Sequence, residues 1–164
     1  MKAKIRVISA LCALFLALPL HADNGLRNLN DGSEQSIEQL QESGKWTIVM
    51  IWASDCAVCN REASQYSDFN MMYADDKAKV VGISLDGWAD RVDAADFVDR
   101  HQVSFENLVA ERAEFLPYYE RLTGSRWVGT PSFLVYSPDG ELKAKQVGAV
   151  PVELIEQFIG IEKG

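Results

Sequence analysis

The chain has 164 residues, the length of one domain with its own hydrophobic core. Its composition, 48% hydrophobic and 24% charged, is close to that of ordinary globular proteins and excludes a disordered chain, a collagen-like repeat and a coiled-coil rod. The formal net charge of −8 at pH 7 argues against nucleic acid or an anionic membrane surface as the main partner, because an acidic surface repels phosphate groups.

The first 22 residues have the pattern of a secretory signal peptide. Basic residues lie among the first six, an apolar run covers residues 7–18, and Ala22 precedes a polar segment. We expect cleavage after Ala22, which leaves residues 23–164 as a single domain and places the mature protein in the periplasm. An N-terminal membrane anchor facing the periplasm is the alternative, although about 12 apolar residues is short of the ~20 that span a bilayer.

The predicted elements after the signal peptide alternate between helices and buried strands. A capping box of Ser36 and Gln39 begins a short helix, which Gly44 ends. The nearly unbroken apolar run over 46–52 then predicts a strand buried on both faces of a sheet. Further strands are expected at 80–85, 132–136 and 141–147, and helices at 60–73, 89–101, 111–122 and 151–161. This alternation predicts an α/β domain.

Two cysteines remain once Cys12 is removed with the signal peptide, and their spacing points to chemistry. A bridge between Cys56 and Cys59 closes too small a loop to stabilise the fold appreciably. The pair follows the first buried strand and begins a helix, whose amino end carries unpaired N–H groups that stabilise a thiolate. Cys56 is therefore the predicted nucleophile, and Cys59 is placed to resolve a mixed disulfide.

The residues leave the direction of electron flow open, because the oxidised pair accepts electrons from a dithiol. Asp55 opposes ionisation of the neighbouring thiol, which favours a reductant over an oxidant or isomerase. A zinc site is a less favoured interpretation, since zinc takes four ligands and the mature chain adds only His101, distant in sequence, to the two thiols. Copper(I) accepts two thiolates, so a non-catalytic binding module or copper chaperone is the alternative function.

One segment resembles the active-site sequence of thioredoxin-fold proteins, namely WASDCAVC at residues 52–59, and Thr130-Pro131 before a strand resembles the cis-proline segment of that family. Three further features are similar to the exported TlpA/ResA-like branch, whose members reduce specific disulfides outside the cytoplasm. They are Glu62, three residues after Cys59, the Asp31-Gly32 turn and the segment 81–86. The resemblance implies a thioredoxin-like fold, a central mixed β-sheet of about five strands flanked by helices.

The resemblance also implies an activity and a set of site residues. The chain is expected to be an exported thiol–disulfide oxidoreductase that exchanges disulfides with protein substrates, as a reductant supplied by an upstream electron donor. Four catalytic residues are implied, Cys56, Cys59, Glu62 and Pro131, and two substrate-binding residues, Trp52 and Thr130. The cysteines form the redox-active disulfide, the glutamate moves the proton, and the proline lies against the sulfurs. Thiolate exchange requires no flavin, nucleotide or metal.

Four residues depart from the family pattern, and one of them is Asp55, which replaces the tryptophan or other aromatic residue common before the first cysteine. Met50 stands where thioredoxin itself has a buried aspartate, which leaves Glu62 or water to accept the proton of Cys59. Val58 replaces the usual proline between the cysteines, and Ser64 replaces a proline often found along the active-site helix. These departures leave the substrate surface and the reduction potential open.

Overall fold

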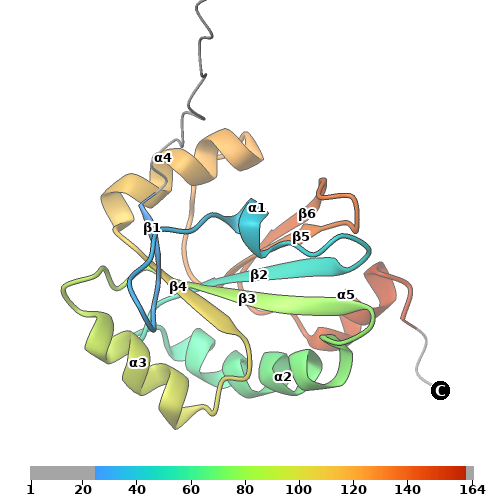
Figure 1. The fold of residues 1–164 in the computed structure, drawn as a ribbon, viewed down its shortest axis with the longest axis horizontal. Helices are drawn as coiled ribbons and strands as arrows, with labels where there is room; N and C mark the ends of the chain where they lie inside the picture. The colour runs from blue at the N-terminus through green and yellow to red at the C-terminus, as the bar shows by residue number, and fades with distance from the viewer. Residues whose placement is uncertain (1–24, 162–164) are drawn as a thin grey trace, which may run out of the picture.

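The computed structural model describes residues 25–161 of the chain, and the expected signal peptide lies outside them. A six-stranded sheet runs through the centre in the order β1-β4-β3-β2-β5-β6 (Figure 1). Its strands are β1 (Leu26–Asn28), β2 (Trp46–Trp52), β3 (Ala78–Ser84), β4 (Glu106–Ala110), β5 (Ser132–Tyr136) and β6 (Leu142–Val147). The sheet is mixed as expected, because β2, β3 and β4 are parallel while the other three strands pair antiparallel.

Helices cover both faces of the sheet: α2, α3 and α5 pack on one face, and α1 and α4 on the other (Figure 1). Their bounds are α1 (Ile37–Leu40), α2 (Ala57–Tyr73), α3 (Arg91–Arg100), α4 (Arg112–Thr123) and α5 (Val152–Phe158). The expected capping box of Ser36 and Gln39 is present at α1. In residues 25–161, none of these helices combines the length and the apolar character needed to cross a membrane.

Strand β2 is the centre of two separate hydrophobic cores, because its side chains alternate between the faces of the sheet. Met50 and Trp52 belong to the core under α2, α3 and α5, whereas Val49 and Ile51 belong to the core under α1 and α4. All four are completely buried, as an unbroken apolar run predicts. The strand therefore gives a rigid base to the turn that follows it.

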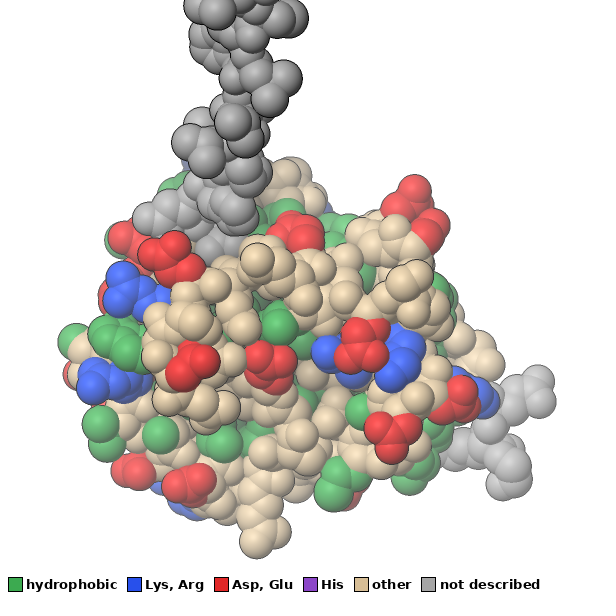
Figure 2. Space-filling view, viewed as in Figure 1, with side chains coloured by type: hydrophobic (Ala, Val, Ile, Leu, Met, Phe, Trp, Pro, Cys, Tyr) green, Lys and Arg blue, Asp and Glu red, His purple; other side chains and the backbone are tan. Residues whose placement is uncertain are grey.

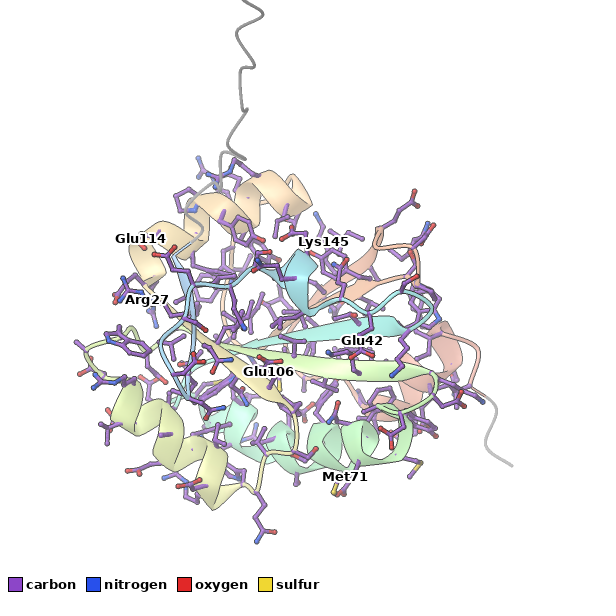
Figure 3. All side chains as sticks on the ribbon, viewed as in Figure 1. Arg27, Glu42, Met71, Glu106, Glu114 and Lys145 are labelled. Carbon is purple, nitrogen blue, oxygen red and sulfur yellow. A yellow bond between two sulfur atoms is a disulfide. The ribbon has the colours of Figure 1, made fainter. Side chains whose placement is uncertain are left out.

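Two strands were not among the predicted ranges, and both depend on distant contacts. The edge strand β1 has only three residues and pairs with β4. Asn28 of β1 donates a hydrogen bond to Oε1 of Glu106 at 2.8 Å, and Figure 3 labels Glu106 near the middle of the sheet. Strand β4 begins with the polar residues Glu106 and Asn107, so its sequence does not have the apolar pattern of a buried strand. Their hydrogen-bond partners, Asn28 and Trp52, lie in other strands.

Charged side chains on the surface agree with the acidic composition. On the face that Figure 2 shows, Lys and Arg side chains lie in separate small groups among Asp and Glu side chains.

The outer side of α2 faces solvent. Met71 on this side projects away from the sheet (Figure 3) and is 67% exposed. The opposite side of the same helix faces the sheet and carries the buried cysteine.

Candidate active site

The turn after β2 delivers Cys56 to the amino end of α2. Cys56 is the N-cap of this helix, and its Sγ accepts a hydrogen bond from the backbone N–H of Cys59 at 3.1 Å. A disulfide joins the two residues, whose Cα atoms are 5.2 Å apart. Cys59 is completely buried, whereas Cys56 is partly exposed. The pair is therefore asymmetric, because solvent reaches part of Cys56 and does not reach Cys59.

The N-cap role of Cys56 also explains why α2 begins at Ala57 and not at residue 60, where the sequence predicted its start. Serine, threonine, aspartate and asparagine are the usual N-cap residues, and none of them marks this boundary. Here a sulfur takes the place of the capping oxygen. The helix therefore begins directly at the cysteine, where the field of its unpaired N–H groups is strongest.

Asp86 fixes the turn from the neighbouring strand. Its carboxylate accepts hydrogen bonds from the backbone N–H of Ser54 at 3.1 and 3.2 Å and from the Ser54 hydroxyl at 3.0 Å. The hydroxyl of Ser84, at the end of β3, donates to the same carboxylate at 2.7 Å. No local motif marks Asp86 as a support of this turn, although its position after the buried strand β3, which is parallel to β2, places it at the edge where β2 also ends.

Asn60 and His101 bind the other side of the turn. The Asn60 side-chain amide donates to the carbonyls of Ser54 at 3.0 Å and Cys56 at 2.9 Å. Nε2 of His101, at the end of α3, lies 2.8 Å from Oδ1 of Asn60. The histidine that is distant in sequence is therefore adjacent to the site in space.

Glu62 lies one turn beyond Cys59 on α2 and is partly buried. Its Oε2 accepts a hydrogen bond from the backbone N–H of Val150 at 3.2 Å, and Tyr66 donates to the carbonyl of Val150 at 2.8 Å. Burial, followed by the charge of Glu62, raises the pKa of the Tyr66 phenol, so that this group stays a donor. Both side chains hold the loop between β6 and α5 against α2.

The Thr130-Pro131 segment lies at the same edge of the sheet. Ile51 near the end of β2 pairs with Ser132 at the start of β5, so the preceding proline is beside the carboxyl end of β2. The peptide bond between Thr130 and Pro131 is cis, as the resemblance implied. The Pro131 carbonyl accepts a hydrogen bond from Gly148 at 2.9 Å, which joins this segment to the loop that Glu62 holds. Its contact with the sulfurs stays a prediction.

Comparison with known proteins agrees with this geometry. Residues 21–145 match the AhpC/TSA family. The chain belongs to the AhpC/TSA family. It is 25% identical over 139 residues to "Thiol-disulfide oxidoreductase ResA" of Oceanobacillus iheyensis, covering 84% of this chain and 68% of the relative. It is 21% identical over 120 residues to "Sporulation thiol-disulfide oxidoreductase A" of Bacillus subtilis, covering 73% and 69%.

Solved structures confirm the thioredoxin-like fold of this AhpC/TSA domain. The thioredoxin-related protein from Neisseria meningitidis serogroup B superposes with a TM-score of 0.69 at 21% identity, over 83% of this chain and 96% of that one. The thioredoxin domain of a Bacteroides vulgatus thiol-disulfide oxidoreductase gives a TM-score of 0.65 at 18% identity, over 81% and 90%. The resemblance to the TlpA/ResA-like branch is confirmed, and the sheet has six strands where about five were expected.

Trp52 of the AhpC/TSA domain lies beneath the site. Its side chain is completely buried, stacks on Phe97 with ring centroids 4.1 Å apart, and donates from Nε1 to Oδ1 of Asn107 at 3.1 Å. Gly82 leaves room for this pair, since a Cβ there would lie 2.9 Å from Trp52 Nε1. The indole therefore has no exposed surface with the disulfide closed, and the substrate contact that the resemblance implied for Trp52 stays a prediction.

An acidic cavity of about 410 Å³ opens beside the turn. Its charged lining consists of Asp55, Asp86, Asp90, Asp93, Glu111 and Arg112. Five carboxylates against one guanidinium give the lining a net negative charge, and negative charge near Cys56, to which Asp55 is adjacent in sequence, opposes formation of a thiolate. In residues 25–161, no group of three or more His, Cys, Asp and Glu side chains is arranged to hold a metal ion.

Proposed function

We propose that this chain is an exported thiol–disulfide oxidoreductase that reduces disulfides in protein substrates. The observation that carries the proposal is the asymmetry of the Cys56–Cys59 pair, in which a partly exposed cysteine caps a helix with its sulfur and its partner is completely buried. Thiol exchange needs an attacking sulfur that substrate can reach and a second sulfur that only the first can reach. The names of the two relatives support the same activity.

The reaction starts from the reduced pair. The Cys56 thiolate attacks one sulfur of a substrate disulfide, the substrate S–S bond breaks, and the other substrate sulfur leaves as a thiolate. Cys59 then loses its proton and attacks Cys56 Sγ, which releases the second substrate sulfur and forms the Cys56–Cys59 disulfide seen in the structure. Two electrons pass to the substrate, and a dithiol donor restores the reduced pair.

Glu62 is the proposed acceptor of the Cys59 proton. Cys59 is completely buried, so its proton needs an acceptor within the protein or a bound water. Met50, buried in the same core, brings no carboxylate to this position, whereas Glu62 follows Cys59 by one turn of α2. The same carboxylate also accepts the Val150 N–H, so a test must separate proton transfer from support of the loop.

Glu62→Gln is expected to slow the attack of Cys59 on a mixed disulfide by roughly 10²-fold, because glutamine accepts the Val150 N–H but takes no proton. The measurement is the single-turnover decay of a mixed disulfide on Cys56, followed from pH 5 to 9. Gln65→Ala is the matched control, since Gln65 makes the corresponding contact with Val152 N–H at 3.5 Å. A wild-type rate in Glu62→Gln across this range would limit Glu62 to holding the loop.

Two features support the export and the direction of the reaction. The signal-peptide pattern of the first 22 residues supports a periplasmic site of action. The acidic surroundings of Cys56 support a reductant, because a strong oxidant depends on a stabilised reduced form and carboxylates destabilise the thiolate.

A trapping experiment tests the activity. Cys59→Ser, expressed with its native leader, is expected to accumulate covalent adducts between Cys56 and substrate proteins, which a dithiol releases on a non-reducing gel. The double variant Cys56→Ser/Cys59→Ser is the matched control and should carry none. Equal adducts on both variants, or none on either, would contradict the proposal.

A further inference from the structure

We propose that Asn60 and His101 are positioning residues that hold the turn bearing Cys56 against the amino end of α2. The inference rests on the proposed function, because it concerns how the attacking sulfur is placed. It is carried by one hydrogen-bonded chain, from His101 through the Asn60 amide to the carbonyls of Ser54 and Cys56.

The contacts fix the orientation of both side chains. The Asn60 amide nitrogen faces two carbonyl oxygens, which only accept, so the amide oxygen must face His101. That oxygen also only accepts, and His101 Nε2 therefore carries a hydrogen. Both the neutral ring with Nε2–H and the protonated ring can donate this bond. The chain of contacts has one consistent arrangement of donors and acceptors.

The turn is held from both sides. The two carbonyls that Asn60 binds belong to Ser54 and Cys56, the residues on either side of the exposed Asp55. The Cys56 carbonyl also accepts the backbone N–H of Asn60 at 3.0 Å, while Asp86 holds the N–H of Ser54. The segment before the nucleophile is thus tied to α2 through its carbonyls and to the end of β3 through its amide.

His101 is itself firmly placed, which makes it a suitable anchor for the amide. It is the C-cap of α3, and its ring lies 4.6 Å from that of Phe97, which stacks on Trp52. The next residue, Gln102, has a positive φ of 49°, which ends the helix at this point. Burial, followed by the charge of Arg100, lowers the pKa of His101, consistent with a neutral ring.

The consequence for chemistry lies in the position of Cys56 Sγ. This sulfur accepts the N–H of Cys59 at 3.1 Å, and the same donor stabilises a thiolate after reduction. If the turn is released from Asn60, the sulfur loses its fixed position relative to the helix amino end. Its thiol then becomes less acidic and less reactive at neutral pH.

The test measures the thiol directly, by the pH dependence of iodoacetamide alkylation at Cys56 in the reduced protein, with the adduct located by mass spectrometry. Asn60→Ala is expected to slow alkylation at pH 7 by about threefold to tenfold, the effect of one or two hydrogen bonds. His101→Leu should act in the same direction, and His101→Gln, which can donate to Asn60, should recover part of the rate. In the Asn60→Ala background, His101→Leu should have no further effect.

Asn70→Ala is the matched control. Asn70 also lies on α2 and uses its amide on backbone groups, donating to Ser104 O at 3.2 Å and accepting from Val80 N at 2.9 Å, but away from the cysteines. It should lower stability and leave the alkylation rate unchanged. If Asn60→Ala does not fold, the alkylation rate of Cys56 is measured in Asn60→Ser, which has a shorter polar side chain.

Three results would overturn the proposal: wild-type alkylation in folded Asn60 variants, additive effects of the Asn60 and His101 changes, or equal slowing in Asn70→Ala. Alkylation requires no substrate, so its outcome is separate from that of the trapping experiment. Loss of trapped adducts with an intact alkylation pattern would contradict the proposed function and leave the positioning role standing.

Discussion

Cys56→Ser is expected to reduce the turnover of protein disulfides to the background rate of the dithiol donor alone. A serine oxygen forms no mixed disulfide, and the remaining Cys59 is completely buried and cannot be reached by substrate. The measurement is insulin reduction by the purified mature protein with a dithiol as electron source. The same result identifies the accessible sulfur at the start of α2 as the nucleophile.

Two further variants make the Cys56 result specific. Cys59→Ser keeps the attacking thiol but cannot resolve the adduct, so it should bind about one substrate per chain and then stop. Ser64→Ala, on an exposed position of α2, should retain wild-type turnover. The variant must be shown by a separate measurement to be folded. If its turnover is then within about twofold of the wild type, Cys56 has no part in the mechanism.

Trp52→Ala is expected to destabilise the protein by about 3–5 kcal/mol, the range for truncating a large buried aromatic side chain. The indole is completely buried, packs face to face on Phe97, and satisfies Asn107. A loss of this size is a large fraction of the about 5–15 kcal/mol that stabilises a typical domain. The measurement is denaturant unfolding followed by far-ultraviolet circular dichroism.

A conservative change separates the two contributions of Trp52 to stability, the packing of its ring and its hydrogen bond to Asn107. Trp52→Phe keeps an aromatic ring against Phe97 but leaves the Asn107 oxygen without its indole donor, at a cost of about 1–3 kcal/mol for a buried acceptor. Trp88→Phe is the control, because Trp88 is only partly buried and lies beside the Arg27 and Arg91 guanidinium groups. Equal losses in Trp52→Phe and Trp88→Phe would argue against a special role for the buried ring.

The fold was most predictable where burial is visible in a single segment. The run over 46–52 is apolar on both faces, and β2 has those bounds because both cores need its side chains. Strand β4 was missed because Asn107 interrupts its apolar pattern. That asparagine is buried only because Trp52 and the Phe105 carbonyl satisfy its amide, and the sequence does not show such partners.

The site was predictable in its chemistry and less so in its supports. The spacing of Cys56 and Cys59 after a buried strand indicated the nucleophile and its partner. The contacts of Asp86 with Ser54 and of His101 with Asn60 join residues 32 and 41 positions apart. Nothing in local spacing reports such pairs, because they form only when α3 and the end of β3 pack beside the turn.

The loop between β6 and α5 connects the end of the chain to the chemistry at its middle. The Val150 N–H donates a hydrogen bond to Glu62, and the Val150 carbonyl accepts one from the Tyr66 hydroxyl. The Gly148 N–H donates to the Pro131 carbonyl. Proteolytic clipping after residue 147 would remove neither cysteine, yet it would detach this common anchor and take Val150 and Ile155 out of the core that contains Cys59. Damage to this loop is therefore expected to lower the thiol–disulfide exchange activity, although the loop contains no reacting atom. Any shortened or tagged form of the protein needs an intact loop between β6 and α5.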